Sequence, residues 1–573
     1  MGLYNNPILA GFNPDPSIVR VGPDYFLVTS TFEYFPGVPI YHSRDLVSWT
    51  LVGHALTRRS QLDVRTPEAG GGVWAPTIRH RDGVFYVAAA CFDRYRPQAD
   101  DRVWPRGFCV WTRDVWGEGG WSEPVWFDQV GFDQDLFWDT STSPPTVLLS
   151  TTFRNTDNTS PPQPLTTTTT TTTTTKTKNF SIHLSPTSLP TGRALAPPVL
   201  ARSSPVGPRV AEGAHLFRRG RWVYLFSAEG GTEGAHREVV CRMDVSGDGD
   251  GDGGGEGDGV FGRLLRRGEE AWEVGPVVLG EGLGDDGDGG EEGEVGSCGH
   301  ADLVEDEGGR WWAVFLGVRR GRKGKGKGVS VFGRETFLVP VTWVDDWPVF
   351  NADRKVGLVG EAEGLYQLAS SPAWRDDFAA EKMQLGWYRK NTPLKEDYSL
   401  TERPGYLRLY GGPYTLSTPA CPTVFLRKQT HDPVTWETRL SFRPDSSKTE
   451  AGAVVYWNQH TYSSIGIRKA PEGGRIIRVR PAEGEAKDFQ LKSLDSDVVL
   501  TIKSDDGYEL GFKEFGLEHD EVEVRWVGRV SSEIMTRDPS VGAAFTGMML
   551  GVYAFGELEQ CFAPADFEYA TSY

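Results

Sequence analysis

The chain has 573 residues, enough for two to four domains at roughly 150 residues each. Asp and Glu outnumber Lys and Arg by 78 to 60, a net charge of −18, which argues against binding to nucleic acid or to an anionic membrane. Aromatic residues make up 12% of the chain and Gly occupies 69 positions, a composition that indicates short strands joined by tight turns.

The N-terminal residues show no pattern of a secretion signal. Residues 1–7 have neither a basic start nor an apolar core, and the chain has no run of about 18 apolar residues that would span a membrane. We therefore expect a cytoplasmic protein, with secretion as the alternative. The six cysteines form no Cys-x-x-Cys pair, so we expect reduced, mostly buried thiols rather than a zinc site, with one disulfide, such as Cys91 with Cys109, as the alternative.

Three segments have the composition of insertions in surface loops. Residues 155–193 are rich in Thr, Ser and Pro and include ten consecutive threonines, 166–175, while residues 246–259 and 280–294 are almost wholly Gly and acidic. Such segments bury too little apolar area to order themselves. A calcium-binding repeat is the alternative for the two acidic tracts, but a regular nine-residue period is missing.

With these insertions set aside, a turn followed by an aromatic or β-branched strand recurs five times. Equivalent positions in the copies, 60 to 89 residues apart with the insertions in the longest gaps, are Tyr25, Phe85, Val147, Trp222 and Trp311. Such a repeat predicts an all-β fold in which residues 1–345 form a five-bladed β-propeller.

A distinctive residue precedes each copy of the repeat by ten to fourteen positions. These residues are Asp15, Trp74, Asp133, Glu212 and His300. Because equivalent positions of propeller blades face one axis, the repeat predicts that they meet in a single pocket. Glycoside hydrolysis needs one carboxylic acid to protonate the leaving oxygen and one carboxylate to act as base or nucleophile. A third carboxylate raises the pKa of the acid, so two Asp and one Glu suit this reaction.

The pattern changes after the fifth copy of the repeat. Residues 346–375 are predicted to be a linker. Residues 376–573 contain many short β-prone runs separated by clusters of Gly, Pro, Asp and Ser, which is typical of an antiparallel β-sandwich.

Several motifs resemble glycoside hydrolase family 43, in its β-xylosidase and α-L-arabinofuranosidase members. They include residues 13–17, 29–40, 71–77, 132–137, 212–216 and 333–336. Residues 403–409 and 450–453 are similar, more weakly, to the concanavalin A-like sandwich of such β-xylosidases. The resemblance implies a five-bladed propeller and an inverting mechanism. It assigns Asp15 as general base, Glu212 as general acid, and Asp133 as the residue that tunes the pKa of Glu212 and holds it in place.

The resemblance also implies further pocket residues, most of them with a plainer alternative. Phe32 and Trp74 form apolar walls for a sugar or are core aromatics. Arg334 reaches sugar hydroxyls or makes a surface ion pair, and Thr232 and His236 shape the pocket floor. His300 lies near a calcium ion or is a hydrogen-bonded structural residue. The family often has Pro-Ser where this chain has Gln134-Asp135, so Asp135 is a rival to Asp133.

The expected function is that of an exo-β-1,4-xylosidase that releases xylose from the non-reducing end of xylo-oligosaccharides. The alternatives are an α-L-arabinofuranosidase, a bifunctional enzyme, or a non-catalytic carbohydrate-binding protein. The reaction is expected to need no cofactor, with calcium the one ion in question. The expected partner is a xylo-oligosaccharide or an arabinose-substituted oligosaccharide, and a homo-oligomer is also considered.

Overall fold

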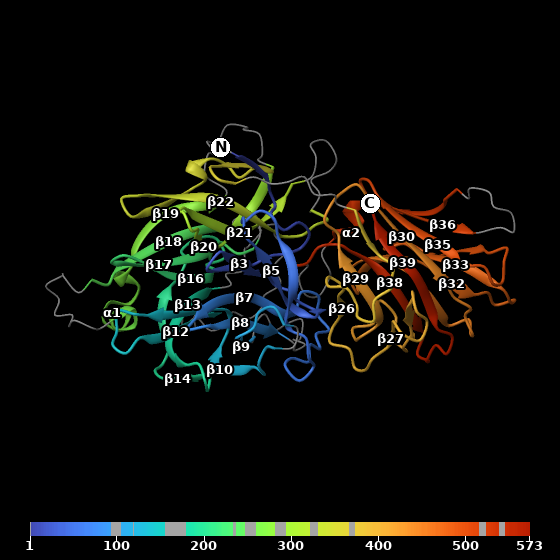
Figure 1. The fold of residues 1–573 in the computed structure, drawn as a ribbon, viewed down its shortest axis with the longest axis horizontal. Helices are drawn as coiled ribbons and strands as arrows, with labels where there is room; N and C mark the ends of the chain where they lie inside the picture. Colours follow the sequence, from blue (N-terminus) through green and yellow to red (C-terminus); the bar gives the residue numbers. More distant parts are fainter. Residues whose placement is uncertain are drawn as a thin grey trace, which may run out of the picture.

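The computed structural model describes residues 2–92, 105–117, 120–154, 179–232, 236–246, 259–280, 294–320, 330–365, 373–514, 523–537 and 545–573. These residues form two β-domains that lie side by side (Figure 1), an N-terminal one in blue to yellow and a C-terminal one in orange to red. The expected all-β fold, a propeller followed by a sandwich, is confirmed.

The described N-terminal residues contain five successive antiparallel sheets. The first consists of β2 (Ser17–Val21), β3 (Asp24–Val28), β5 (Gly37–Ser43) and β6 (Thr50–Leu56). The second consists of β7 (Gly72–Arg81), β8 (Val84–Phe92), β9 (Arg106–Thr112) and β10 (Val125–Val130). The third consists of β11 (Phe132–Asp139), β12 (Thr146–Arg154) and β13 (Phe180–Ser188), with β14 (Arg193–Ala194) and β15 (Val199–Arg202) both paired to β13.

The fourth sheet consists of β16 (Ala211–Arg219), β17 (Trp222–Glu229), β18 (Arg237–Asp244) and β19 (Glu273–Gly280). The fifth consists of β20 (Val295–Glu305), β21 (Trp311–Arg319), β22 (Glu335–Val344) and β23 (Trp347–Phe350). The first strands of the sheets contact one another in a ring, β2 to β7 to β11 to β16 to β20 and back to β2. This is how propeller blades surround an axis. The five repeat positions found in the sequence lie on the second strands, β3, β8, β12, β17 and β21.

The third sheet corrects the expected extent of the Thr-rich insertion. β13 lies inside the segment 155–193 that was assigned to a loop, and its Ile182 and Leu184 are buried in the core of the third and fourth sheets. Apolar residues at alternate positions explain why this part folds as a strand despite its Ser and Pro content. Residues 155–178, and the acidic tracts from 247 to 258 and from 281 to 293, lie outside the described residues.

The expected linker is also shorter than predicted. β23 pairs with β22, so the fifth sheet ends at Phe350, which is buried, and not at residue 345. After the short turn η2 (Asn351–Asp353), β24 (Val359–Ala362) pairs with β1 (Gly2–Asn5). β25 (Trp374–Asp376) already belongs to the sandwich, where it pairs with the last strand of the chain.

The C-terminal domain consists of two sheets that enclose one large core. The six-stranded sheet runs in the order β29 (Thr423–Lys428), β38 (Met549–Gly556), β31 (Thr449–Asn458), β32 (Thr461–Lys469), β33 (Arg475–Arg480) and β34 (Lys487–Gln490). The other sheet runs β27 (Tyr398–Ser399), β28 (Leu407–Leu409), β39 (Ala565–Ser572), β30 (Val434–Ser441), β35 (Val498–Ser504), β36 (Tyr508–Glu514) and β37 (Arg525–Val530), with β25 on β39. Trp387 and Trp436 are among the largest side chains buried between them. The two domains also share a small sheet, in which β26 (Arg389–Lys390) pairs with β4 (Tyr34–Phe35) of the propeller.

Helices are few among the described residues. α1 (Gly259–Arg267) and the short η1 (Gly268–Ala271) pack against β15, and α2 (Ser532–Met535) is a single turn. None of the helices in this part of the chain is long and apolar enough to cross a membrane. The six cysteines, which all lie in the described part of the chain, form no disulfide and five of them are buried. This agrees with the expectation of mostly buried thiols and not with the alternative of a disulfide.

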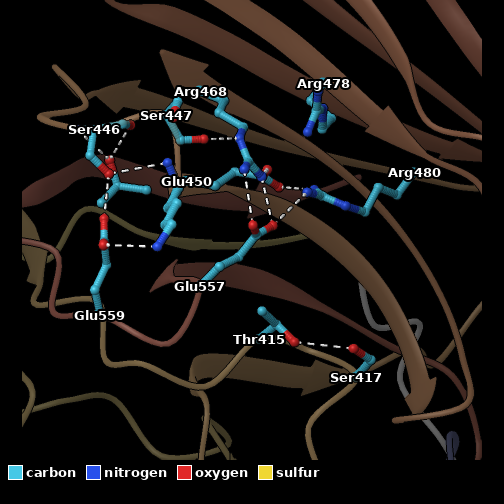
Figure 2. A network of polar contacts seen from close by, with 12 residues as sticks. Thr415, Ser417, Ser446, Ser447, Glu450, Arg468, Arg478, Arg480, Glu557 and Glu559 are labelled. Carbon is cyan, nitrogen blue, oxygen red and sulfur yellow. Dashed lines mark hydrogen bonds and ion pairs between the residues drawn. The ribbon is translucent and has the colours of Figure 1, made fainter. Parts of the chain in front are cut away.

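The outer face of the six-stranded sheet carries a network of buried charges (Figure 2). Glu450, fully buried on β31, accepts hydrogen bonds from Tyr553 Oη at 2.8 Å, from Arg468 Nη1 at 3.5 Å and from Arg480. Glu557 accepts two more from Arg468, at 2.8 and 3.1 Å. A buried carboxylate needs such partners, because burying an unpaired charge is costly.

Replacement of Glu450 by Ala is expected to destabilise the sandwich strongly. It would leave two guanidinium groups without their buried partner, a loss of about 3 kcal/mol in the free energy of unfolding. Calorimetry of the full chain measures this as a lower Tm for the transition of the sandwich. The exposed ion pair of Glu509 with Arg529 gives the matched control, since Glu509→Ala should cost below about 1 kcal/mol. Equal effects of the two substitutions would contradict this account.

Candidate active site

Each of the five sheets has a residue with left-handed backbone just before or within its first strand, close to the predicted site residue. The φ angles are 55° at Asp15, 40° at Ala75, 56° at Asp133, 61° at Gly213 and 56° at His300. In the second to fifth sheets the pairing register shifts across this point, as at a β-bulge. Positive φ is unfavourable for residues other than Gly, and such strain collects at functional sites.

The bulges correct the expected alignment of the repeat. Asp15, Asp133 and His300 occupy the left-handed position itself, whereas Trp74 and Glu212 lie one residue before it. The five residues were predicted to be equivalent, and two of them are displaced by one position. The extra residue of a bulge carries no signal in the apolar pattern, so the sequence could not reveal this displacement.

Three of the predicted carboxyl groups interact at the propeller axis. Burial raises the pKa of Asp133 well above its usual range, and the charges of Glu212 and Asp15 raise it further. Asp133 Oδ2 accepts a hydrogen bond from Gly213 N at 2.8 Å, directly beside Glu212 in the chain. The structure therefore brings Asp15, Asp133 and Glu212 within electrostatic reach of one another.

Asp15 is held by residues from several sheets. Its Oδ2 accepts a hydrogen bond from Ser30 Oγ at 2.5 Å, and its Oδ1 accepts one from Arg334 Nη1 at 3.0 Å. Nδ1 of His300 lies 3.6 Å from the same Oδ1. The hydroxyl of Ser30 in turn accepts a hydrogen bond from Ala75 N at 2.7 Å. This arrangement fixes the direction in which the carboxylate of Asp15 points.

A second layer of polar residues lies next to the carboxyl cluster. Arg79 Nη2 contacts Asp135 Oδ1 at 2.7 Å, and Arg79 Nη1 contacts Asp302 Oδ2 at 2.8 Å. Ser17 Oγ also donates to Asp302 Oδ2, at 2.7 Å. Burial opposes ionisation of Asp302, but the charge of Arg79 prevails and lowers its pKa to about 2.

Asp135, the rival to Asp133, belongs to this second layer. Its Oδ1 forms an ion pair with Arg79, and its Oδ2 accepts a hydrogen bond from Leu216 N at 2.8 Å. Asp133 and Asp135 both accept hydrogen bonds from backbone amides of β16, as expected for residues on one face of a strand. Since Asp135 is neutralised by Arg79 while Asp133 faces Glu212 and Asp15, the geometry favours Asp133 as the third carboxyl group.

The predicted aromatic residues meet a third ring that comes from the sandwich. The ring of Phe545 lies 5.6 Å from that of Phe32 and 6.1 Å from that of Trp74, between centroids. The guanidinium of Arg334 lies 5.3 Å from the Phe545 ring and 5.5 Å from the Phe32 ring. Phe545 was not identified from the sequence, because nothing in a local pattern links it to residues more than 200 positions earlier.

Of the remaining predicted residues, His236 and His300 lie close enough to Asp15 for its charge to affect them. His236 is buried, its Nδ1 lies 3.0 Å from Ser297 O, and a Cβ on Gly299 would lie 2.6 Å from its ring. Thr232 is half-buried just after β17. Burial lowers the pKa of His300 to about 3, so its ring is neutral. This ring packs against Gly213, where a Cβ would lie 2.9 Å away.

The surroundings of His300 supply few ligands for a calcium ion. Calcium takes six to eight oxygen ligands, whereas the carboxylate that faces the His300 ring, that of Asp15, also pairs with Arg334. The described residues hold no group of three or more His, Cys, Asp or Glu side chains that could hold a metal ion. These residues do not by themselves fit a calcium site, and calcium binding stays a prediction.

The propeller carries interacting carboxyl groups at its axis, beside aromatic rings and an arginine. These are the groups that an enzyme needs to bind and cleave a carbohydrate. The family model of glycosyl hydrolases family 43 matches residues 4–253 and 268–348. The model of the β-xylosidase C-terminal concanavalin A-like domain matches residues 375–572. The chain therefore belongs to glycoside hydrolase family 43, whose members are inverting glycosidases that generally need no cofactor.

Similar proteins match most of the chain. It is 32% identical to a non-reducing end α-L-arabinofuranosidase of Bacteroides ovatus, over 99% of this chain and 94% of that protein. It is 33% identical to a putative β-xylosidase of Escherichia coli, over 83% of this chain and 81% of that protein. A crystal structure of a xylan β-1,4-xylosidase from Bacillus halodurans is 27% identical, with a TM-score of 0.80 over 99% of each chain.

Proposed function

We propose that the protein is an exo-β-1,4-xylosidase that releases xylose from the non-reducing end of xylo-oligosaccharides. In this proposal Asp15 is the general base, Glu212 the general acid and Asp133 the modulator. The observation that carries it is the cluster of these three carboxyl groups, in which Asp15 and Asp133 are buried and the charges of Glu212 and Asp15 raise the pKa of Asp133. Like charges in one site cannot all ionise, so the cluster retains a proton that an acid catalyst can donate.

The environments of the two outer carboxyl groups support their assigned roles. Asp15 accepts hydrogen bonds from Ser30 and Arg334, which suits a carboxylate that removes a proton from water. Glu212 adjoins Gly213, whose amide binds Asp133, so it shares the environment that holds the proton. In inverting enzymes the acid and base lie about 6.5–9.5 Å apart, with the attacking water between them. Hydrolysis then proceeds in one displacement without a covalent intermediate.

Asp133→Asn is expected to move the basic limb of the pH profile of kcat/KM to lower pH. The charge of Asp133 disfavours loss of the proton shared with Glu212, so a neutral amide lets that proton leave at lower pH. We expect a shift of about one pH unit or more, measured by initial rates on 4-nitrophenyl β-D-xylopyranoside. The control is Asp114→Asn, which lies in the loop after β9 and outside the site. An unmoved basic limb would refute the modulator role.

Cleavage of α-L-arabinofuranosides is the second candidate function. It is favoured by the 32% identity to an arabinofuranosidase over nearly the whole of both chains. The test compares kcat/KM of the purified protein on 4-nitrophenyl β-D-xylopyranoside and 4-nitrophenyl α-L-arabinofuranoside. A higher value on the xyloside, together with release of xylose from xylobiose, supports the proposal. A higher value on the arabinoside reverses the order of the two functions, and cleavage of neither overturns both.

A further inference from the structure

The sandwich contacts the propeller beside the proposed catalytic base. Asn13, two residues before Asp15, uses its side-chain Oδ1 to accept hydrogen bonds from Thr29 Oγ1 at 3.3 Å and Tyr41 Oη at 2.8 Å, both within the propeller. The third donor to this oxygen is Nζ of Lys428, at the end of β29 in the sandwich, at 2.7 Å. The shortest of the three hydrogen bonds therefore comes from the other domain.

Lys428 is an unusual donor, because its amine is buried without an acidic partner. Its Nζ lies 4.5 Å from the ring centre of Phe12 and 5.3 Å from that of Tyr388. Burial lowers its pKa to about 7, and among the described residues no carboxylate forms an ion pair with it. Burying an amine in this way is costly, so a position that contributes only packing would favour an apolar side chain.

The backbone is shaped to allow this approach. Gly11 has a φ of 76°, and a Cβ there would lie 2.8 Å from Gln429 O and 3.3 Å from Cβ of Lys428. Asn13 N donates to Arg334 O at 2.9 Å, and Thr336 Oγ1 donates to Asn13 O at 2.5 Å. Asn13 is thus fastened to the same residue, Arg334, whose side chain binds Asp15.

The sandwich also supports Arg334 from the other side. Met548 N donates to Val331 O at 2.8 Å, and Gln429 N donates to Met548 O at 3.0 Å. A Cβ on Gly333 would lie 2.7 Å from Thr546 O. The segments that carry Lys428 and Phe545 are therefore joined to each other and to the turn before Arg334.

We propose that Lys428 is a positioning residue for the catalytic base: its hydrogen bond to Asn13 lets the docked sandwich set the orientation of the Asn13-Pro14-Asp15 turn. Catalysis by the propeller then depends on the sandwich through a defined polar contact, in addition to the aromatic contact of Phe545. The inference rests on the proposed role of Asp15.

The test is Lys428→Met in the full-length chain, assayed on 4-nitrophenyl β-D-xylopyranoside well below its Tm. Methionine keeps an apolar stem over Phe12 and Tyr388 but lacks the amine that donates to Asn13. Because small displacements of a catalytic group are costly, we expect kcat to fall roughly 10- to 100-fold, with KM changed less than about threefold. Lys448→Met, which removes an exposed lysine paired with Glu559, should leave kcat unchanged. Should Lys428→Met not fold, Lys428→Gln, which is too short to reach Asn13, gives the same comparison.

A double-mutant cycle separates positioning from general stability. If Lys428 acts through Asn13, the variant with both Lys428→Met and Asn13→Ala is no slower than Asn13→Ala alone. A Lys428→Met enzyme with a lower Tm but wild-type kcat, or fully additive losses in the cycle, would overturn the inference. Failure of the proposed function is distinguishable, because it appears in the wild-type protein as absence of cleavage, whereas failure of this inference appears only in the variants.

Discussion

Glu212→Gln is expected to lower kcat on xylobiose by about 10³-fold or more, because the departing xylose is a poor leaving group that must be protonated. On 4-nitrophenyl β-D-xylopyranoside the fall should be much smaller, roughly tenfold, since nitrophenolate leaves with little help from an acid. Steady-state kinetics on the two substrates measure the difference. The contrast between leaving groups identifies the general acid more specifically than loss of activity alone.

The control for this experiment is Glu273→Gln on β19 of the same sheet. Glu273 forms an ion pair with Arg242 near the surface, and its replacement should leave both rates unchanged. An equal loss of Glu212→Gln on both substrates would show that Glu212 does not protonate the leaving group. A variant as fast as wild type on xylobiose would remove Glu212 from the mechanism.

Asp15→Asn is expected to lower kcat by about 10³-fold on xylobiose and on the nitrophenyl xyloside alike. The reason is that water must be deprotonated during attack whichever group departs. The amide keeps the size of the side chain. Its oxygen can still accept from Arg334 and its NH2 group can donate to Ser30 Oγ, at the positions of the two carboxylate oxygens, so the loss reports on the missing base. Steady-state kinetics of both substrates, with circular dichroism as a check of folding, measure it.

Asp24→Asn is the matched control for the base. Asp24 lies in the same sheet and pairs with His42 and Arg44, outside the site, so the variant should retain wild-type kcat. A loss in Asp15→Asn confined to xylobiose would instead assign Asp15 as the acid. If the roles of base and acid are reversed, Asp15→Asn and Glu212→Gln exchange their expected patterns.

The architecture was predictable because its signals are local. Turn residues followed by apolar strands recur in each sheet, and the five marker residues such as Tyr25 and Trp311 all lie on second strands. The prediction was wrong where it relied on amino-acid composition and not on the alternation of apolar residues. β13 was assigned to a loop because its segment is rich in Ser and Thr, although Ile182 and Leu184 occupy alternate positions as buried strand residues do.

The site was predictable only in part. Asp15, Asp133 and Glu212 could be found through the repeat and the family motifs, but the one-residue offset of Glu212 could not. It depends on a bulge in which Ala75, Asp133 and Gly213 take the same backbone conformation with unrelated side chains. Phe545 and Lys428 reach the site from the second domain. Contacts between distant segments leave no local pattern, so only the folded chain reveals them.

The anomeric configuration of the first-formed product tests the central claim most directly, because it reports on how the acid and base act together. Hydrolysis of 4-nitrophenyl β-D-xylopyranoside by the wild-type protein is followed by proton NMR before mutarotation mixes the anomers. With Asp15 activating water and Glu212 protonating the leaving oxygen, α-xylose appears first. Initial release of β-xylose would require a covalent intermediate and would contradict the account.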